Sequence, residues 1–288
     1  MTAIANALRP WKALLIIVCV LAVLLVLAWV VIRLVSAQML FYPNADPEAH
    51  EALLANPEVE HLRIEGEDGA LSGYLLRGAE GPAPLVLYFG GNGENAARTV
   101  RKLTQDEARR AAFSGCHFAQ IDYPGYGLSE GKPSAATLRR AALAAYDALS
   151  ARDDVTEILV LGYSIGTGPA NYCAASRPAS ALILMAPYAD GVDLFNNVVN
   201  VFHGPLRLLV SYDMESVKYA SDVTVEPLIF ATEADALVPW ASSKRLSEAY
   251  PASCRFITVP GITHEDFWRT PMVLDEISRC VMAATQEE

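Results

Sequence analysis

The segment ILVLGYSIGTGPANYCAASRP, residues 158–178, contains the pattern that decides the fold. Its apolar run over residues 158–163 predicts a buried strand, and residues 166–176 are typical of a helix. Between the two, GYSIG at residues 162–166 places a glycine two positions before and two positions after Ser164. Such neighbours let a strand turn sharply into a helix and leave the serine hydroxyl exposed at the tip of the turn. The pattern therefore predicts a nucleophilic serine in an α/β fold.

Short apolar runs similar to the one before Ser164 recur on both sides of it. They are LVLYF (85–89), HFAQID (117–122), ALILMA (181–186), PLIFA (227–231) and RFITVP (255–260). Runs that are apolar at nearly every position are typical of strands covered on both faces by helices. The helix-like segments between them are residues 95–112, 135–150, 241–250 and 265–284. We therefore expect a mostly parallel sheet of about eight strands flanked by helices.

Two regions depart from this alternation of strands and helices. Residues 59–76 alternate between apolar and polar side chains around Asp68 and Gly69, which predicts an antiparallel hairpin at the start of the sheet. Residues 190–222 insert a long segment between two strands that elsewhere are separated by one helix. The apolar side chains of this insertion fit packing on the core and a small cap over a pocket equally well.

A nucleophilic serine needs a base, and the base needs an acid that orients it. In folds with this kind of elbow the partners follow in the chain order Ser, Asp or Glu, His. His264 alone among the five histidines stands on a loop after the last predicted strand, and it is the predicted base. Asp235, a few residues past the preceding strand, is the preferred acid. Asp190 and Asp193 are alternatives for the acid, and Glu233 is a weaker one.

The glycine-rich loop at residues 90–93 follows the first central strand. From Gly91 onward its spacing is similar to that of a dinucleotide-binding turn, which keeps a nucleotide-binding oxidoreductase as an alternative. That turn needs an acidic residue at the end of the second strand, whereas Asp122 at this place lies further along and begins a Pro-Gly turn. We interpret the loop as a source of backbone N–H donors for a carbonyl oxygen, with the N–H of Ile165 as the second donor.

The N-terminal segment predicts a membrane span. Residues 13–32 contain no charged side chain, and a helix of this length covers a hydrocarbon core of about 30 Å. An uncleaved anchor over residues 1–37 is preferred to a signal peptide, because the apolar run is long and Arg33 interrupts it before a cleavage-like site. Arg9 and Lys12 precede the span and acidic residues follow it, which places the N-terminus in the cytoplasm and the large domain on the outer side.

The rest of the chain divides into a connector and one large domain. Residues 38–58 contain Pro and Asn and show no periodic element, and the catalytic domain is expected over residues 59–288. The net charge of -11 argues against a nucleic-acid partner, because no basic patch can displace counterions from phosphates. The five cysteines lack metal-ligand spacing, and we expect neither a metal nor a cofactor.

Several motifs in a fixed order resemble the α/β-hydrolase superfamily over about residues 40–284. They are FYP, GGNGEN, DYPGYGLSEGKPS, GYSIGTGPA, ATEADALVP and THEDFW. The resemblance is to a membrane-anchored branch that includes palmitoyl-protein thioesterases, monoacylglycerol-type lipases and serine-aminopeptidase-like hydrolases. It implies an α/β-hydrolase fold with a small cap insertion, preceded by one N-terminal transmembrane helix.

Position by position, the resemblance implies that Ser164, Asp235 and His264 are catalytic. It also implies that the main-chain N–H groups of Asn92 and Ile165 form the oxyanion hole.

The positions next to these are expected to have supporting roles. Gly91 and Tyr163 are predicted to contact the substrate, whereas Asp122 and Tyr126 in the DYPGYG motif are predicted to be scaffold. The family usually has histidine where this chain has Gly90, so we expect the glycine loop to be supported differently here.

The sequence thus predicts a membrane-anchored serine hydrolase that cleaves a carboxylic ester or thioester, with a small-molecule or acyl-lipid substrate and no nucleic-acid partner. The alternatives are a peptidase of the serine-aminopeptidase type and a catalytically silent binding protein on a hydrolase fold.

Overall fold

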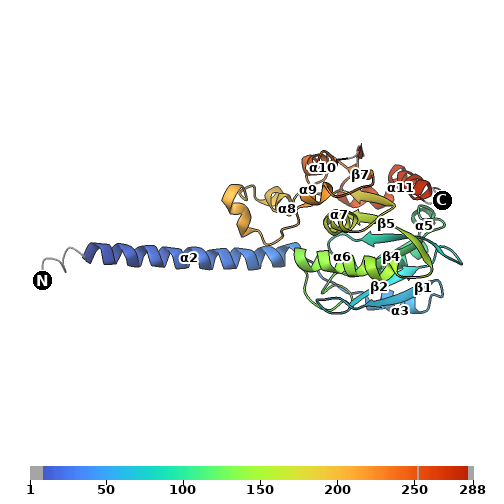
Figure 1. The fold of residues 1–288 in the computed structure, drawn as a ribbon, viewed down its shortest axis with the longest axis horizontal. Helices are drawn as coiled ribbons and strands as arrows, with labels where there is room; N and C mark the ends of the chain where they lie inside the picture. The colour runs from blue at the N-terminus through green and yellow to red at the C-terminus, as the bar shows by residue number, and fades with distance from the viewer. Residues whose placement is uncertain (1–8, 252, 285–288) are drawn as a thin grey trace.

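The computed structural model describes residues 9–251 and 253–284, and its centre is an eight-stranded sheet with the order β1-β2-β4-β3-β5-β6-β7-β8. A long N-terminal helix extends away from this sheet and its covering helices (Figure 1). Residues 1–8 of the predicted anchor region and residues 285–288 of the predicted catalytic domain lie outside the described residues.

The strands confirm the predicted sheet. They are β1 (Val59–Ile64), β2 (Leu71–Leu76), β3 (Ala83–Phe89), β4 (His117–Ile121), β5 (Val155–Tyr163), β6 (Ala181–Met185), β7 (Pro227–Ala231) and β8 (Arg255–Thr258). Strand β2 pairs antiparallel with both β1 and β4, and the remaining neighbours are parallel. The side chains of β4, β6 and β7 are buried throughout, because helices cover both faces of these strands.

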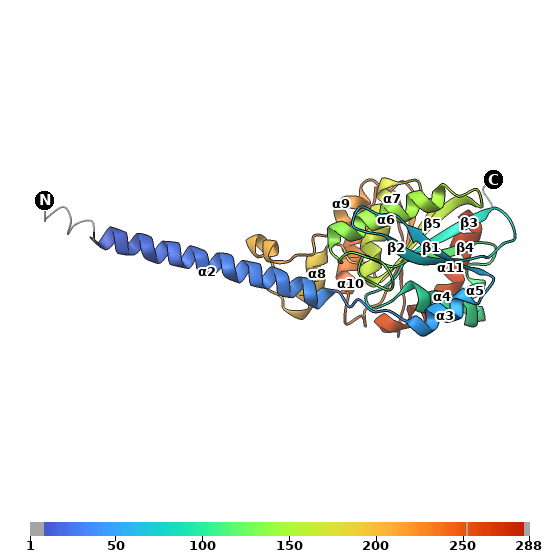
Figure 2. The same ribbon diagram turned by 90° about the horizontal axis from the view of Figure 1, so that it is seen from below.

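The helices alternate with the parallel strands as expected. They are α2 (Arg9–Leu40), α3 (Pro47–Leu54), α4 (Ala96–Gln105), α5 (Glu107–Ala111), α6 (Ala135–Ser150), α7 (Thr167–Ser176), α8 (Gly191–Val198), α9 (Ser216–Ala220), α10 (Trp240–Ser247) and α11 (Pro271–Ala284), with the 3-10 turns η1 (Ser164–Gly166), η2 (Gly204–Leu209) and η3 (His264–Arg269). Helices α6 and α7 cover one face of the sheet, and α4, α5 and α11 cover the other (Figure 2). The helix predicted over residues 95–112 is divided at Asp106, whose side chain accepts the Arg109 N–H and caps α5.

Residues 38–58, which we expected to lack a periodic element, contain helix α3. The side chain of Asp46 caps this helix by accepting the Ala49 N–H at 3.0 Å, and Pro47 occupies its first position. Ala49 and Leu53 are fully buried in the core. A helix of two turns presents too few apolar residues for a periodic pattern, so its packing becomes evident only in the folded chain.

Helix α2 is long and apolar enough to cross a membrane. Within the stretch Trp11–Val35, an 18-residue window has a mean hydropathy of 3.5, and none of that window is buried against the rest of the chain. The helix continues to Leu40, beyond the predicted end of the anchor region. Near its C-terminal end the Trp29 indole N–H and the Arg33 guanidinium each donate to the Leu208 carbonyl at 3.1 Å, which joins the helix to the insertion.

The insertion at residues 190–222 divides into a packed part and a projecting part. Tyr212 and Met214 are buried in the core, whereas Val198 and Leu208 are 76% and 71% exposed. The projecting part, from α8 to η2, lies beside the C-terminal end of α2 (Figures 1 and 2). Residues 210–214 therefore pack on the core, and a cap formed by the projecting part stays a prediction.

Candidate active site

The serine elbow has the strained backbone that its sequence predicts. Ser164 has a φ of 53°, in the left-handed region that costs a residue other than glycine about 1–3 kcal/mol. A Cβ atom added to Gly162 would lie 2.7 Å from the Ala170 Cβ, and one added to Gly166 would lie 2.1 Å from the Phe89 carbonyl oxygen. Only glycine fits at these two positions, and the close packing that they permit holds Ser164 at the tip of the turn.

The three side chains predicted as catalytic meet at the carboxyl edge of the sheet. His264 Nε2 lies 2.9 Å from Ser164 Oγ, and His264 Nδ1 lies 2.7 Å from Asp235 Oδ2. Asp235 follows β7 and His264 follows β8, so their loops leave the parallel sheet at the same edge as the elbow. The His264 and Asp235 side chains are only 6% and 2% exposed, whereas Ser164 is partly accessible.

Backbone hydrogen bonds orient the Asp235 carboxylate. Its Oδ1 accepts the N–H groups of Leu237 and Val238, both at 2.8 Å. The other oxygen is thereby left to face the imidazole of His264.

The alternative acids lie elsewhere and hold the insertion. Asp190 caps α8 by accepting the Val192 N–H at 2.9 Å and is paired with Arg207. Asp193 contacts Ser242 and Arg245. These contacts give both carboxylates structural partners away from the imidazole.

The glycine loop lies directly against the elbow. A Cβ atom added to Gly91 would lie 2.8 Å from the Tyr163 ring, and one added to Gly166 would lie 2.5 Å from the Gly90 carbonyl oxygen. The loop that contains Asn92 and the turn that contains Ile165 are therefore in contact, which is the arrangement that two oxyanion donors require.

The side chain of Asn92 bonds this loop to the end of α2 and to the segment that follows it. Its Oδ1 accepts the Tyr42 N–H at 3.0 Å and the Tyr126 hydroxyl at 2.8 Å, and its Nδ2 donates to the Leu40 carbonyl. Tyr126, predicted as scaffold, is thus in direct contact with a predicted oxyanion residue.

Asn44 also joins the segment after α2 to the glycine loop through hydrogen bonds. Its Nδ2 donates to the Gly93 carbonyl at 2.6 Å, and its Oδ1 accepts from Asn95 Nδ2 at 2.6 Å. Sequence reasoning missed this role of residues 40–44, although the FYP motif pointed to the same segment.

The space beside Gly90 is filled in a way that the sequence did not indicate. A Cβ atom added to Gly90 would lie 2.5 Å from Gln120 Nε2 and 2.9 Å from Glu94 Oε2. The same Glu94 oxygen accepts the Gly91 N–H and the Tyr88 hydroxyl, both at 2.7 Å. A carboxylate from the loop itself thus supports the loop, and it occupies the Gly91 N–H that we expected to face the substrate.

Tyr163 packs against the predicted base. Its hydroxyl donates to the His264 carbonyl at 2.9 Å, and the two rings are 5.2 Å apart between centroids. Only 7% of Tyr163 is exposed. Tyr163 therefore supports His264 through these contacts, and its contact with the substrate stays a prediction.

Asp122 is a buried carboxyl group at the end of β4. Its Oδ1 accepts the Ala96 N–H at the start of α4 at 2.7 Å. Burial raises the pKa of Asp122 to about 7, although hydrogen bonds from the backbone of Ala96 and Leu128 act in the opposite direction. Its contacts are those of a scaffold residue below the glycine loop.

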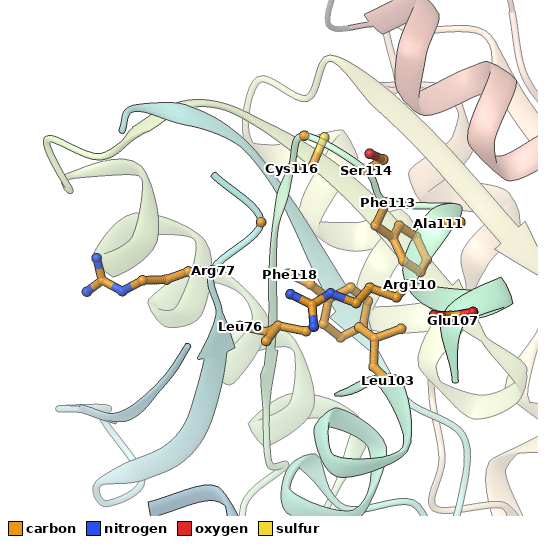
Figure 3. Close-up of a pocket in the computed structure, with 12 residues that line it drawn as sticks. Leu76, Arg77, Leu103, Glu107, Arg110, Ala111, Phe113, Ser114, Cys116 and Phe118 are labelled. Atoms are coloured by element: carbon orange, nitrogen blue, oxygen red, sulfur yellow. The ribbon is translucent and has the colours of Figure 1, made fainter. Parts of the chain in front are cut away.

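A separate cavity of about 220 Å³ lies at the opposite edge of the sheet, where β4 begins (Figure 3). Leu103, Phe113 and Phe118 line it, together with Arg110, which forms an ion pair with Glu58 at 3.0 Å. None of the predicted site residues reaches it, and we assign no reaction to it. Within the part of the chain that the structure describes, no group of three or more His, Cys, Asp or Glu side chains could hold a metal ion.

Comparison with known proteins agrees with the fold. No family model matches the chain. An uncharacterised protein of Mycobacterium tuberculosis (strain ATCC 25618 / H37Rv) is 30% identical over 242 residues, which cover 83% of this chain and 82% of that protein. The α/β-hydrolase domain-containing protein 17C of Xenopus tropicalis is 29% identical over 77% of this chain and 70% of its own length.

Two further similar proteins have names that state an activity or a bound ligand. The lysophosphatidylserine lipase ABHD12 of Xenopus tropicalis is 27% identical over 71% of this chain and 59% of its own length. The structure of Est1E from Butyrivibrio proteoclasticus with bound ferulic acid superimposes with a TM-score of 0.62 at 19% identity, over 77% of this chain and 98% of that one. By sheet order, by the elbow and by these relatives, the chain belongs to the α/β-hydrolase superfamily of hydrolytic enzymes.

Proposed function

We propose that this protein is a serine hydrolase that cleaves a carboxylic ester or thioester through a covalent acyl-enzyme. The observation that carries the proposal is the unbroken line of hydrogen bonds from Asp235 Oδ2 through the His264 ring to Ser164 Oγ, at 2.7 and 2.9 Å. A nucleophile, a base and an orienting acid within hydrogen-bond reach are the arrangement that activates a serine hydroxyl.

In the first half of the proposed reaction, Ser164 Oγ attacks the carbonyl carbon while its proton passes to His264 Nε2. Asp235 stabilises the resulting imidazolium through the proton on Nδ1. The bond between the carbonyl carbon and the leaving oxygen or sulfur then breaks, and the leaving group takes the proton from Nε2. In the second half, water attacks the acyl-enzyme, its proton passes to His264 and on to Ser164, and the carboxylic acid departs.

The negative charge on the carbonyl oxygen is stabilised by the main-chain N–H groups of Asn92 and Ile165. The contact between the glycine loop and the elbow supports this pairing. Preorganised donors of this kind contribute roughly 10² to 10³ in rate each.

Two features support a lipid-type acyl ester as the substrate. One relative is named a lysophosphatidylserine lipase, and helix α2 is long and apolar enough to hold the domain at a bilayer. Among serine hydrolases, a domain held at the membrane surface meets lipid esters at high local concentration.

The proposed topology is a single span with the N-terminus in the cytoplasm and the catalytic domain on the outer side. Protease added to cells with a permeabilised outer layer should digest the domain and spare the span. Protection of the domain would place it in the cytoplasm.

The proposed activity is tested with p-nitrophenyl acetate and a fluorophosphonate probe. Ser164→Ala should abolish both hydrolysis and labelling, because no other hydroxyl lies within reach of His264 Nε2 among the described hydrogen bonds. The exposed Ser221 provides a matched control, and Ser221→Ala should keep both. Full labelling of a folded Ser164→Ala variant, with circular dichroism equal to that of the unmodified protein, would rule out Ser164 as the nucleophile.

A further inference from the structure

An apolar groove lies between the C-terminal part of α2 and the insertion. Its volume is about 490 Å³, within the range of ligand-binding clefts. Val31, Ile32 and Val35 form the wall on α2, and Phe195, Val198 and Val199 form the facing wall on the insertion. Figures 1 and 2 show α8 beside this end of α2. No charged side chain lines the groove within the described residues.

The insertion wall is left open to the surroundings. Val198 is 76% exposed and Val199 is 53% exposed. Contiguous exposed apolar surface on a folded domain marks a binding site for an apolar ligand, a membrane or a partner.

Hydrogen bonds link both walls of the groove to loops of the candidate active site. Tyr42 lines the groove, and its N–H donates to Asn92 Oδ1 at 3.0 Å. Next to the wall residue Val198, Asn197 at the end of α8 donates to the carbonyls of Ala236 and Leu237 at 2.6 and 3.2 Å, in the loop that contains Asp235. Both walls are therefore attached to loops that surround Ser164.

The α2 wall of the groove belongs to the stretch that we propose as the membrane span. The stretch Trp11–Val35 meets the length and hydropathy of a membrane span, so the wall residues on α2 belong to its last turns. The contacts of Trp29 and Arg33 with the Leu208 carbonyl keep the insertion against this part of the helix. The groove therefore has one wall on the proposed membrane span, and its lining residue Tyr42 is bonded to Asn92 of the glycine loop.

We propose that this groove binds the acyl chain of the substrate, a lipid ester that enters from the bilayer. The inference rests on the proposed function, because the bound chain must end in a carbonyl group at Ser164. Walls made of Val, Ile, Leu and Phe, with Tyr42 as the polar exception among the described lining residues, suit an unbranched hydrocarbon chain better than a polar headgroup. The attachment of both walls to the site loops directs the carbonyl end of the chain toward Ser164.

The test compares acyl-chain selectivity in two tryptophan variants of the full-length protein in detergent micelles. Val198→Trp fills the groove without adding charge, and Val201→Trp makes the same change on an exposed valine of the insertion that does not line the groove. The readout is the ratio of kcat/KM for p-nitrophenyl dodecanoate to that for p-nitrophenyl acetate. We expect the ratio to fall by about tenfold or more in Val198→Trp and to stay unchanged in Val201→Trp.

The outcomes separate the groove from the catalytic assignment. Equal ratios in the two variants would overturn the groove proposal while leaving acetate hydrolysis as support for the serine hydrolase. Hydrolysis of neither ester by the unmodified protein would overturn the proposed function, and with it the role of the groove in catalysis.

A second measurement does not depend on turnover. An ester with a photoactivatable acyl chain, added to Ser164→Ala, should crosslink to residues 194–202 of the insertion. Crosslinks confined to α2 would mean that the chain contacts only the membrane side, and they would contradict the proposal.

Discussion

Ser164 stands between two groups of loops that are held in place differently. On one side, the hydrogen bonds that join Asp235, His264 and Ser164 come from loops that leave β5, β7 and β8. On the other side, the glycine loop after β3 is held by Leu40 at the end of α2 and Tyr42 just after it, by Tyr126 after β4, and by its own Glu94.

We call the loops with Ser164, Asp235 and His264 the triad side, and the glycine loop with its supports the oxyanion side. All hydrogen bonds that join the three side chains of the triad side come from loops of the sheet. The oxyanion side shares its hydrogen bonds with the chain that leaves the proposed membrane span. We therefore expect changes on the triad side to remove activity outright, and changes on the oxyanion side to reduce it through geometry.

The largest effect is expected for Asp235→Asn on the triad side. An amide in this place donates to His264 Nδ1 and leaves the proton on Nε2, which then cannot accept the serine proton. The value of kcat for p-nitrophenyl acetate should fall by about 10⁴. Asp190→Asn, at the alternative acid that caps α8, should keep kcat close to that of the unmodified protein. Equal losses in both variants would contradict the choice of acid.

The next largest effect is expected at Gly90 on the oxyanion side, where the family usually has histidine. Gly90→His should lower the free energy of unfolding by about 1–3 kcal/mol, because its Cβ would approach Gln120 Nε2 and Glu94 Oε2 to 2.5 and 2.9 Å. Urea unfolding of the full chain in detergent measures this change.

The matched control for that variant is Gly81→His, since a Cβ atom at Gly81 would meet no atom within 4 Å. Its free energy of unfolding should stay near that of the unmodified protein. The same loss of stability in both variants would show that crowding beside the glycine loop is not the cause.

A smaller effect is expected when one tie between the two regions is removed. Tyr126→Phe deletes a hydroxyl that donates to Asn92 Oδ1 at 2.8 Å, while the Tyr42 N–H keeps its bond to the same oxygen. A hydrogen bond of this kind contributes about 0.5–1.5 kcal/mol, so kcat/KM for p-nitrophenyl acetate should fall by about two- to tenfold.

Tyr250→Phe provides the comparison for this tie. Its hydroxyl also donates to an asparagine oxygen, Asn171 Oδ1, at 2.8 Å, but far from the glycine loop. It should lower stability and leave kcat/KM unchanged. If Tyr126→Phe likewise lowers stability and leaves kcat/KM unchanged, the hydrogen bond of Tyr126 to Asn92 does not position the predicted oxyanion donors.

The smallest effect is expected from Asp122, which lies below the oxyanion side. Its folded-state pKa of about 7 is above the ordinary aspartate value, so the folded protein binds a proton that the unfolded chain releases. This contribution to stability is fully present below about pH 4 and is lost as the pH rises toward 7. Asp122→Asn should therefore flatten the dependence of the free energy of unfolding on pH between 4 and 7. Parallel curves for the two proteins would show that Asp122 does not titrate in this range.

The sheet and the three triad positions could be predicted from the sequence because they leave local signals. An apolar run such as residues 227–231 marks a buried strand by itself, and the order of Ser164, Asp235 and His264 follows the order of the strand ends. The parallel sheet then brings these strand ends to one edge, so positions distant in the chain become neighbours without any further information.

The support of the glycine loop could not be predicted in this way. The Asn92 side chain pairs with Leu40 and Tyr42, about fifty positions earlier in the chain, and neither contact produces a periodic pattern. The support that Glu94 gives beside Gly90 could not be predicted either, since a glutamate in a loop is ordinarily solvated.

The sequence by itself thus determined the order of strands and helices, the elbow, and which three side chains would meet at the sheet edge. The tertiary structure alone decided that α3 belongs to the core, that the insertion both packs and projects, and that α2 and α8 enclose a groove. The physical reason is that strand burial and chain order are encoded in neighbouring residues. The contact of Trp29 with Leu208 and those of Asn92 depend on how distant segments pack, which no local pattern records.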